Sequence, residues 1–452
     1  MDSYKKLAFP VRDIAKAYGL EESKGEIDYN KPRPVGYQPT AEELEYVTND
    51  VLIVAKALNA QFAQGLDKMT QGSDALNFCK NMIGKRDWEY YFPVLSKEMD
   101  DSIRRAYKGG AVMVHPDREN IEVYNGHSFD KNSMYPWAMC KTQPVGVPLW
   151  FDGKYSYDER YPLYIQVLST EFKVKDGFLP TIQLKNNPGY IQTEYLTQSK
   201  EQTRLVLTSV DLELFFRHYE PYNIRYEGGF KFKAANGIFD EFIEYWYKVK
   251  AESTGAKRSI AKLMLNSCYG KLASRTEVKS KIPYLENNIV KYAVSEPKIK
   301  KSVYTAAAAF ITSYGRESVI SAAQALGGSR SDSHFCYMDT DSVHVCGISV
   351  EDANKIIDID PKRLGAWKHE YSFERAKYLR QKCYIEEIAY RKGTMEYEKY
   401  VEKMTGLPIE EQQKAKFELG KAAYYEYIKR CAGMSEDIKC MISYDEFDFD
   451  YS

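Results

Sequence analysis

The chain has 452 residues, of which 44% are hydrophobic and 28% charged, and its formal net charge is −1. This composition excludes a disordered or fibrous protein, and at roughly 150 residues per domain it leaves room for about three domains with real cores. The near-neutral charge gives no sign of a broadly basic DNA-binding surface, so any contact with nucleic acid must come from local groups of Lys and Arg.

Cysteine spacing and hydropathy exclude two further classes. The eight cysteines include no CxxC pair, and no secretory signal precedes them. A zinc ribbon or redox motif is therefore unsupported, and free thiols are expected. The longest apolar stretch, around residues 306–311, is far too short to cross a bilayer, so we expect a cytoplasmic protein without a membrane partner.

Residues 1–70 are predicted to be mostly helical. Apolar residues recur at helical spacing across 41–67, and Thr40 followed by Glu43 fits a capping box. Residues 71–141 alternate more and predict strands at AVMVHP and IEVYNGHSFD, with Asn125-Gly126 as a candidate hairpin turn.

The middle of the chain mixes element types. Residues 142–238 combine short strand patterns with turns, which predicts an inserted α+β module. The block 239–273 is helical but interrupted at 253–255, which predicts two helices with a bend. Residues 274–305 are basic and favour strands, and residues 306–324 return to helix.

The last third begins with a β-rich apolar segment, 333–347, and continues to a charged, Tyr-rich stretch at 396–430 that favours helix. In the first of these, YMDTDSVHV places Asp339 and Asp341 two residues apart, a spacing that aims both carboxylates at one face of a strand. Buried like charges require a cation, and Mg²⁺ prefers carboxylate ligands. A polar turn at a hairpin tip would explain the same tripeptide.

A second pattern lies in KRSIAKLMLNSCYGKLAS. If this segment is helical, Arg258, Lys262, Asn266 and Tyr269 share one face, at steps of four, four and three. The cations could neutralise a triphosphate, and the ring could stack on a base. For the Arg–Lys pair alone, a solvated helix face is the simpler interpretation.

Three motifs together identify a family. DKNSMYP, KLMLNSCYG and YMDTDS resemble, in this order, the motifs DxxSLYP, KxxxNSxYG and YxDTDS of family B DNA polymerases. AYKGGAV resembles the YxGG motif that contacts the template, and LRQKCYI resembles the KxY motif that holds the primer. The segments 142–238 and 274–305 lie where the protein-primed phage branch has two insertions, so the chain is similar to that branch over nearly its entire length.

The resemblance implies an α+β right-hand polymerase fold with palm, fingers and a partial thumb, two insertions and part of an RNase H-like 3′–5′ exonuclease domain. The implied divisions are the C-terminal remnant of the exonuclease domain (1–70), the first part of the palm (71–141), the first insertion (142–238), the fingers (239–273), the second insertion (274–305), the second part of the palm (306–425) and the partial thumb (426–452).

The resemblance also implies a DNA-directed DNA polymerase that uses two Mg²⁺ ions, for which Mn²⁺ can substitute. The implied metal ligands are Asp130, Asp339, Asp341 and the carbonyl of Lys131. The implied dNTP contacts are Tyr135, Lys250, Lys262 and Tyr269, with Tyr135 excluding a 2′ hydroxyl. The implied DNA contacts are Tyr107, Gly109, Gly110, Ser133, Asn266, Ser267, Gly270, Tyr337, Lys382 and Tyr384.

The exonuclease pattern is incomplete. Tyr46 and Asp50 fit its late YxxxD motif, and Lys24 falls where the family has an exonuclease lysine, but no DxE motif precedes them. One carboxylate has too few partners to hold two metal ions, so no editing activity is expected from this chain. The chain is expected to begin part-way through the exonuclease domain and to stop within the thumb.

The expected partners are template–primer DNA, dNTPs and a terminal protein whose hydroxyl starts synthesis, and the protein is expected to be a monomer in the host cytoplasm. Two alternatives stay open. The chain could be an inactive fragment, or half of a split polymerase, that binds DNA or terminal protein. It could also be a polymerase primed by ordinary nucleic acid, against which the two insertion-like segments argue.

Overall fold

The computed structural model describes residues 3–7, 10–183, 195–199, 201–287, 289–300, 303–388, 427–434, 439 and 442–448. The helices are α1 (Val11–Tyr18), α2 (Ala41–Ala63), α3 (Gln71–Ile83), α4 (Lys85–Tyr91), α5 (Lys97–Arg104), α6 (Met134–Met139), α7 (Ser209–His218), α8 (Asp240–Glu252), α9 (Gly255–Leu272), α10 (Thr305–Ala325) and α11 (Val350–Ala353), with short 3₁₀ turns at Ser3–Lys5 and Pro116–Arg118. No helix in these segments is long and apolar enough to span a membrane.

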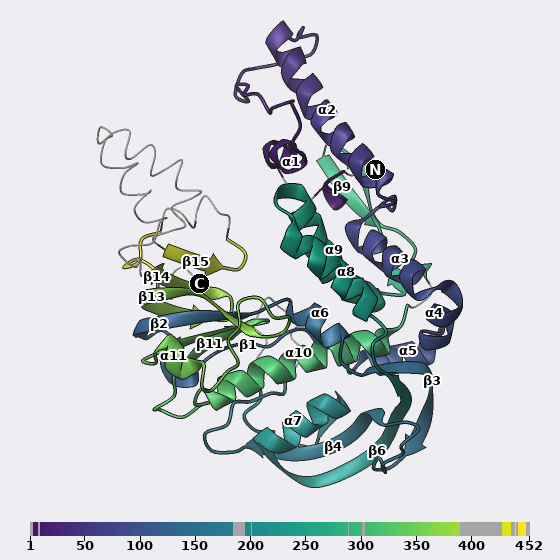
Figure 1. Ribbon diagram of the computed structural model, residues 1–452, viewed down its shortest axis with the longest axis vertical. Coiled ribbons are helices and arrows are strands. Elements are labelled where there is room, and N and C mark those ends of the chain that lie inside the picture. The colour runs from purple at the N-terminus through teal and green to yellow at the C-terminus, as the bar shows by residue number, and fades with distance from the viewer. Residues whose placement is uncertain are drawn as a thin grey trace.

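The largest sheet has seven strands in the order β1-β11-β12-β2-β13-β14-β15, and all its pairings are antiparallel. Its strands are β1 (Val112–Val114), β2 (Glu122–Lys131), β11 (Phe335–Asp339), β12 (Ser342–Cys346), β13 (Trp367–Arg380), β14 (Cys383–Ile388) and β15 (Tyr427–Cys431). Helix α10 runs alongside this sheet (Figure 1) and is buried along most of its length. This sheet carries Asp130 on β2, and Asp339 and Asp341 at the junction of β11 and β12.

A second sheet, of four strands, has the order β3-β6-β4-β5. Its strands are β3 (Gln143–Asp152), β4 (Leu163–Val174), β5 (Thr203–Thr208) and β6 (Tyr219–Ala235). This strongly curved sheet holds α7 on its concave side (Figure 1), where Phe172, Phe215 and Tyr219 pack together. The α+β composition predicted for 142–238 is therefore observed.

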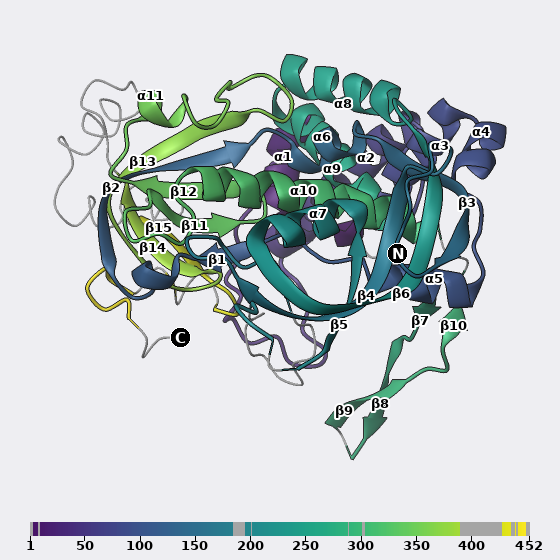
Figure 2. The same cartoon turned by 90° about the horizontal axis from the view of Figure 1, so that it is seen from below.

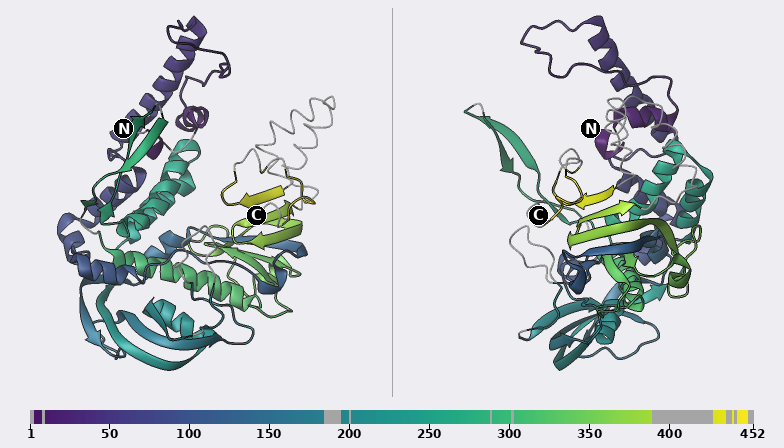
Figure 3. Two further views of the ribbon diagram at one scale, coloured as in Figure 1. Left: turned by 180° about the vertical axis from the view of Figure 1, so that it is seen from behind. Right: turned by 90° about the vertical axis from the view of Figure 1, so that its left-hand side faces the viewer.

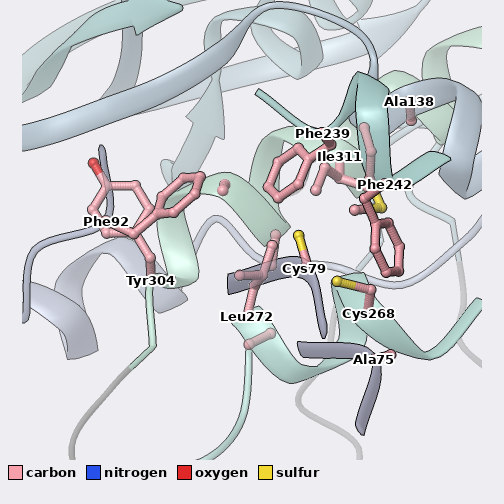
Figure 4. Close-up of a cluster of buried hydrophobic side chains, with 14 of the residues drawn as sticks. Ala75, Cys79, Phe92, Ala138, Phe239, Phe242, Cys268, Leu272, Tyr304 and Ile311 are labelled. Atoms are coloured by element: carbon pink, nitrogen blue, oxygen red, sulfur yellow. The ribbon is translucent and has the colours of Figure 1, made fainter. Parts of the chain in front are cut away.

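Helices α1, α2, α8 and α9 lie to one side of the two larger sheets (Figure 3, left). Helices α8 and α9 meet at residues 253–254, where the sequence predicts a bend, and α3 packs on α9. Figure 4 shows Ala75 and Cys79 from α3 against Cys268 and Leu272 from α9. This core joins α3, α6, α8, α9 and α10 into one unit.

The strands predicted at AVMVHP and IEVYNGHSFD are observed as β1 and β2, but two other features of residues 71–141 differ from the expectation. Residues 71–104 form α3, α4 and α5, because capping side chains start two of these helices: Thr70 accepts from Ser73 N and Ser96 from Met99 N. Asn125-Gly126 lies inside β2 and not at a turn. A Cβ at Gly126 would lie 2.0 Å from Phe373 Cζ, so glycine is needed there for close packing of neighbouring strands.

Helix α2 begins with the predicted capping box, in which the side chains of Thr40 and Glu43 each bond the other's backbone. Its apolar periodicity, however, does not mark a buried face. Val47 and Val51 are 54% and 62% exposed, whereas Ile53 and Ala57 are fully buried. The predicted α-helix is therefore confirmed, but several of the apolar residues that predicted it are exposed to solvent.

Residues 274–305 contain the paired short strands β7 (Glu277–Val278) and β10 (Lys298–Ile299) and the hairpin β8 (Lys281–Glu286) and β9 (Ile289–Val294). The hairpin projects far from the rest of the molecule (Figure 2), and every described residue of its strands is exposed. The helix expected at 396–430 and most of the partial thumb at 426–452 lie outside the described residues.

Candidate active site

The two motif aspartates of YMDTDS stand on either side of a tight turn. Strand β11 ends at Asp339, Thr340 takes a left-handed conformation with φ of 63°, and β12 begins just after Asp341. The expectation that both lie within one strand is therefore wrong. The turn still holds them close together, because the Asp341 amide donates to the Asp339 carbonyl at 2.7 Å.

Asp130 lies on the neighbouring strand β2, directly opposite Ser342 of β12. The Lys131 amide donates to the Asp341 carbonyl at 2.7 Å, which fixes the end of β2 against the turn. Burial, with smaller contributions from the charges of Asp341 and Glu370, raises the pKa of Asp130 to about 7. Burial likewise raises the pKa of Asp341 to about 6. Burial and neighbouring negative charges disfavour the ionised forms of both carboxyl groups. A bound cation would stabilise these ionised forms.

Asp339 is in a different electrostatic environment. Its carboxylate accepts from Lys382 Nζ at 2.7 Å and from the Tyr337 hydroxyl at 3.2 Å. That hydroxyl also accepts from the Lys382 amide at 3.0 Å. The protein thus supplies Asp339 with its own cation. Within the described residues, no three carboxylate, imidazole or thiol groups cluster closely enough to complete a metal site.

A cleft of about 760 Å³ opens over these carboxylates. It is lined by Ser128, Asp130, Asp339, Thr340, Asp341, Ser342, His344, Glu370, Tyr371, Lys382, Tyr384, Ile428, Arg430, Cys431, Ala432, Gly433, Met434 and Lys439. Glu370 was missed by sequence reasoning, because it belongs to no motif and reaches the site only through the pairing of β13 with β2. Arg430 was missed for the same kind of reason, since it comes from β15.

The glycine-rich turn at 107–110 packs against the aspartate turn. A Cβ at Gly110 would lie 2.8 Å from Thr340 Cγ2, and the Thr340 amide donates to the Ala111 carbonyl at 2.7 Å. The carbonyl of Gly109 accepts from Arg316 Nη1 at 2.8 Å. Glycine is therefore required at position 110, because Thr340 leaves no room for a side chain there. In the same turn, burial raises the pKa of Tyr107.

The predicted helix face on α9 is observed. Arg258, Lys262 and Asn266 are exposed, while Tyr269 is half-buried and stacks on Tyr135 with ring centroids 4.1 Å apart. Ser267 lies on the same helix, partly buried, and Gly270 is exposed.

Lys250 of α8 donates to Ser133 Oγ at 2.9 Å, which ties this helix to the start of α6. Burial lowers the pKa of Lys250, and the charges of Arg258 and Lys262 lower it further. A group of cations that repel one another is an arrangement that an anion would stabilise.

The KxY residues take different positions. Lys382 reaches Asp339, as described above, and is half-exposed. Tyr384 is 6% exposed and packs on Tyr337 and Tyr378 at centroid distances of 4.9 and 5.6 Å. Its ring therefore forms part of the floor of the cleft, and little of its surface is exposed for contact with a ligand.

Known proteins share both this sequence and this architecture. Residues 1–358 match the sequence profile of the family described as DNA polymerase type B, organellar and viral. The DNA polymerase of Bacillus phage B103 is 45% identical over 454 residues, spanning the whole chain and 75% of the relative. Those of Bacillus phage phi29 and Streptococcus phage Cp-1 are 44% and 33% identical.

The chain belongs to the type B DNA polymerases. Phi29 DNA polymerase in a ternary complex with primer-template DNA and incoming nucleotide superposes with a TM-score of 0.87 at 43% identity, covering 99% of this chain and 75% of that one. The predicted family, the polymerase fold and the enzyme class are therefore confirmed.

The exonuclease-type residues of the polymerase lie together on and beside α2. Lys24 Nζ stands 5.8 Å from the centre of the Tyr46 ring, and the negative charge of Asp50 raises the pKa of both groups, after larger contributions from hydrogen bonds. Helix α2, which carries Tyr46 and Asp50, lies away from the seven-stranded sheet (Figure 1). Asp50 has no second carboxylate among these neighbours.

The raised carboxyl pKa values predict a pH-dependent stability in the polymerase when metal is removed. A carboxyl with a raised folded-state pKa stabilises the fold fully below its unfolded value of 3.8, and this stabilisation is lost as the pH rises through about 7. We expect the free energy of unfolding in EDTA to fall by about 1–3 kcal/mol between pH 5 and pH 8 through Asp130. Urea titrations of wild type and Asp130→Asn should show a shallower fall for the variant. An equal fall in both would contradict the assignment, and exposed Asp87→Asn is the control.

Proposed function

We propose that this polymerase extends a primer on a DNA template by adding deoxynucleotides at the β11–β12 turn. The observation that supports this most is the pair of partly buried carboxylates, Asp130 and Asp341, whose pKa values are both raised, mainly by burial, where they line an open cleft. Attack of a 3′ hydroxyl on an α-phosphate gathers negative charge, and two divalent ions would stabilise both the attacking and the leaving oxygens.

Asp130 and Asp341 fit Mg²⁺, because their oxygens are hard ligands. The more distant charges of Lys262 and Lys368 lower the pKa of Asp130 but do not offset the effect of burial. The Lys131 carbonyl is a third candidate ligand. Asp339, already paired with Lys382, would hold the turn in place or exchange that lysine for a metal. Substrate phosphate oxygens would supply the remaining ligands.

The nucleotide would lie between α9 and α6. Lys250, Lys262 and Arg258 would neutralise its triphosphate, and Asn266 faces the same side. The stacked rings of Tyr135 and Tyr269 form a wall that would support the sugar and base. Ser133, Ser267 and Gly270 would border this pocket, with Tyr337, Tyr384 and Lys382 toward the primer and Tyr107, Gly109 and Gly110 toward the template.

Sugar discrimination tests this placement. Tyr135→Val should raise ribonucleotide incorporation relative to deoxynucleotide roughly 10–200-fold, since a pocket contact with one small group is worth that much. Tyr135→Phe retains the ring that stacks on Tyr269 and should discriminate nearly as well as wild type. Single-turnover incorporation of dNTP and rNTP measures the ratio, and an unchanged ratio in Tyr135→Val would place the sugar elsewhere.

We further propose that synthesis starts on a protein hydroxyl and displaces the opposite strand. The curved sheet of residues 142–238 and the projecting hairpin β8–β9 are the parts that would contact a terminal protein and the downstream template. Incubation with a phage terminal protein, labelled dATP and Mg²⁺ without primer should label that protein. Extension of ordinary primers without any such labelling would favour the alternative of nucleic-acid priming. No extension of any kind by folded protein would favour the inactive fragment.

Editing should be undetectable in this chain. Asp50 interacts with Lys24 and Tyr46, and among the residues that the structure describes it belongs to no group of three carboxylate, imidazole or thiol side chains that could hold a metal, so we expect it to hold no pair of ions. Wild type and Asp50→Ala should degrade a 5′-labelled single strand equally slowly in Mg²⁺. Metal-dependent 3′–5′ degradation by wild type that Asp50→Ala abolishes would overturn this prediction.

A further inference from the structure

Three pairs of cysteines lie side by side in the described part of the chain, and one of them differs from the others. Cys79 and Cys268 face each other between α3 and α9. Cys383 and Cys431 are opposite each other on β14 and β15, with sulfurs 3.6 Å apart. Both of these pairs are buried. Cys336 of β11 and Cys346 of β12 form the third pair, and this one contacts an arginine.

Arg118 lies in the 3₁₀ turn that precedes β2 and contacts the pair Cys336–Cys346. Its Nη1 donates to the sulfurs of both Cys336 and Cys346. Its other hydrogen bonds go to the backbone carbonyls of Ser333 and His334. No carboxylate among the described residues forms an ion pair with Arg118. The positive charge of a half-buried guanidinium needs a nearby negative charge to offset the cost of its burial. Beside Arg118, the groups that could provide this negative charge are the two cysteine thiols, one of which could ionise to a thiolate.

We propose that Cys346 is a reactive thiolate, held by Arg118 and by the Cys336 thiol, and that it is a site of oxidation and alkylation for which Cys336 is the resolving partner. Cys346 is partly exposed, so a small reagent can reach it, whereas Cys336 is fully buried. This proposal does not depend on the proposed polymerase function.

The protonation pattern agrees with this geometry. A hydrogen bond from Cys336 lowers the pKa of Cys346 to about 7, with a further contribution from Arg118 and against the effect of burial. Burial, and donation of its proton to Cys346, raise the pKa of Cys336. In the Cys383–Cys431 pair, burial raises the pKa of Cys383 to about 12, and the charge of Arg380 opposes this only weakly. The other ionisable groups nearby are Tyr378, which faces Cys336, and the imidazole of His334, which contacts the Cys346 carbonyl.

The chemistry balances with a peroxide as oxidant. The Cys346 thiolate attacks one peroxide oxygen, the O–O bond breaks, and the protonated leaving oxygen departs as an alcohol or water. The resulting sulfenic acid then reacts with the Cys336 thiol, so that the S–S bond forms and water is released. The two sulfurs together lose two electrons, which the peroxide accepts.

Site-resolved alkylation tests the thiolate. The full chain is treated with iodoacetamide between pH 6 and 9, and each cysteine is quantified by peptide mass spectrometry. At pH 7 we expect Cys346 to react at least about tenfold faster than Cys79 and Cys383, because the thiolate is the nucleophile. Arg118→Met should slow Cys346 about tenfold, Arg118→Lys should slow it less, and Arg204→Met, a surface control, should not change it.

Cys346 reacting no faster than the two buried pairs, or at an unchanged rate in Arg118→Met, would overturn the proposal. If Arg118→Met does not fold, Cys336→Ala provides the test, since losing its hydrogen bond should also slow Cys346. Treatment with hydrogen peroxide should yield a Cys336–Cys346 linked peptide. In Cys336→Ser the link should be replaced by a sulfenic acid that dimedone traps. Neither product forming would refute the oxidation step.

Discussion

Asp341→Asn should reduce primer extension by at least about 10³-fold, because it removes one of the two carboxylates available to hold divalent ions at the reacting phosphate. The amide keeps the size and shape of the side chain, and the backbone bond from Lys131 to the Asp341 carbonyl does not depend on the carboxylate. The measurement is single-nucleotide extension of a primer–template with Mg²⁺ and dNTPs, by rapid quench.

The fold of Asp341→Asn should survive, and this separates a catalytic defect from a structural one. Since Asp130 and Asp341 repel each other, removing one charge should leave the free energy of unfolding at pH 8 unchanged or higher. Asp87→Asn, an exposed aspartate on α4, should extend primers like wild type. Extension by Asp341→Asn within tenfold of wild type would refute the placement of the metals.

Arg316→Met should lower the free energy of unfolding by about 3–5 kcal/mol, the usual cost of breaking a buried ion pair by removing one partner. Arg316 is 4% exposed on α10 and donates to both Asp211 oxygens on α7, at 3.1 and 2.6 Å. Burial would raise the pKa of Asp211, yet Arg316 and hydrogen bonds hold it below its usual value. The variant leaves that carboxylate buried without its cation.

The same arginine also connects α7 to the turn at residues 107–110, which packs on the aspartate turn. Its Nη1 donates to the Lys108 and Gly109 carbonyls, which shape the turn that packs on Thr340. Arg316→Met should therefore also weaken template binding, measured as Kd for primer–template DNA. Arg217→Met, which breaks the exposed pair with Glu317, is the matched control and should cost less than about 1 kcal/mol. Equal unfolding energies for the two variants would contradict this role for Arg316.

Local signals predicted several elements correctly. The capping box at Thr40, the bend near residue 254 and the 3.6-residue spacing of Arg258, Lys262 and Asn266 involve near neighbours in sequence, so their geometry follows from the backbone alone. The order and spacing of the three polymerase motifs likewise indicated the family, and the comparisons confirm it.

Other features depend on contacts between residues distant in sequence. The exposed apolar side of α2 and the mid-strand position of Asn125-Gly126 were both predicted wrongly, because their burial is set by the neighbours that pack against them. Glu370 and Arg430 could not be found from motifs, since strand pairing alone brings them to the cleft. The cluster of Arg118 with Cys336 and Cys346 was hidden for the same reason.

The sequence by itself determined the family and the element types with strong periodicity, and it predicted the acidic residues suited to metal, because these rest on residue chemistry and short-range spacing. The tertiary structure decided that Asp339 and Asp341 flank a turn, that Lys382 neutralises Asp339, and that burial raises the pKa values of Asp130 and Asp341. The physical reason is that burial and electrostatic coupling depend on which strands lie side by side, and the pairing of β2, β11 and β12 joins segments about 200 residues apart.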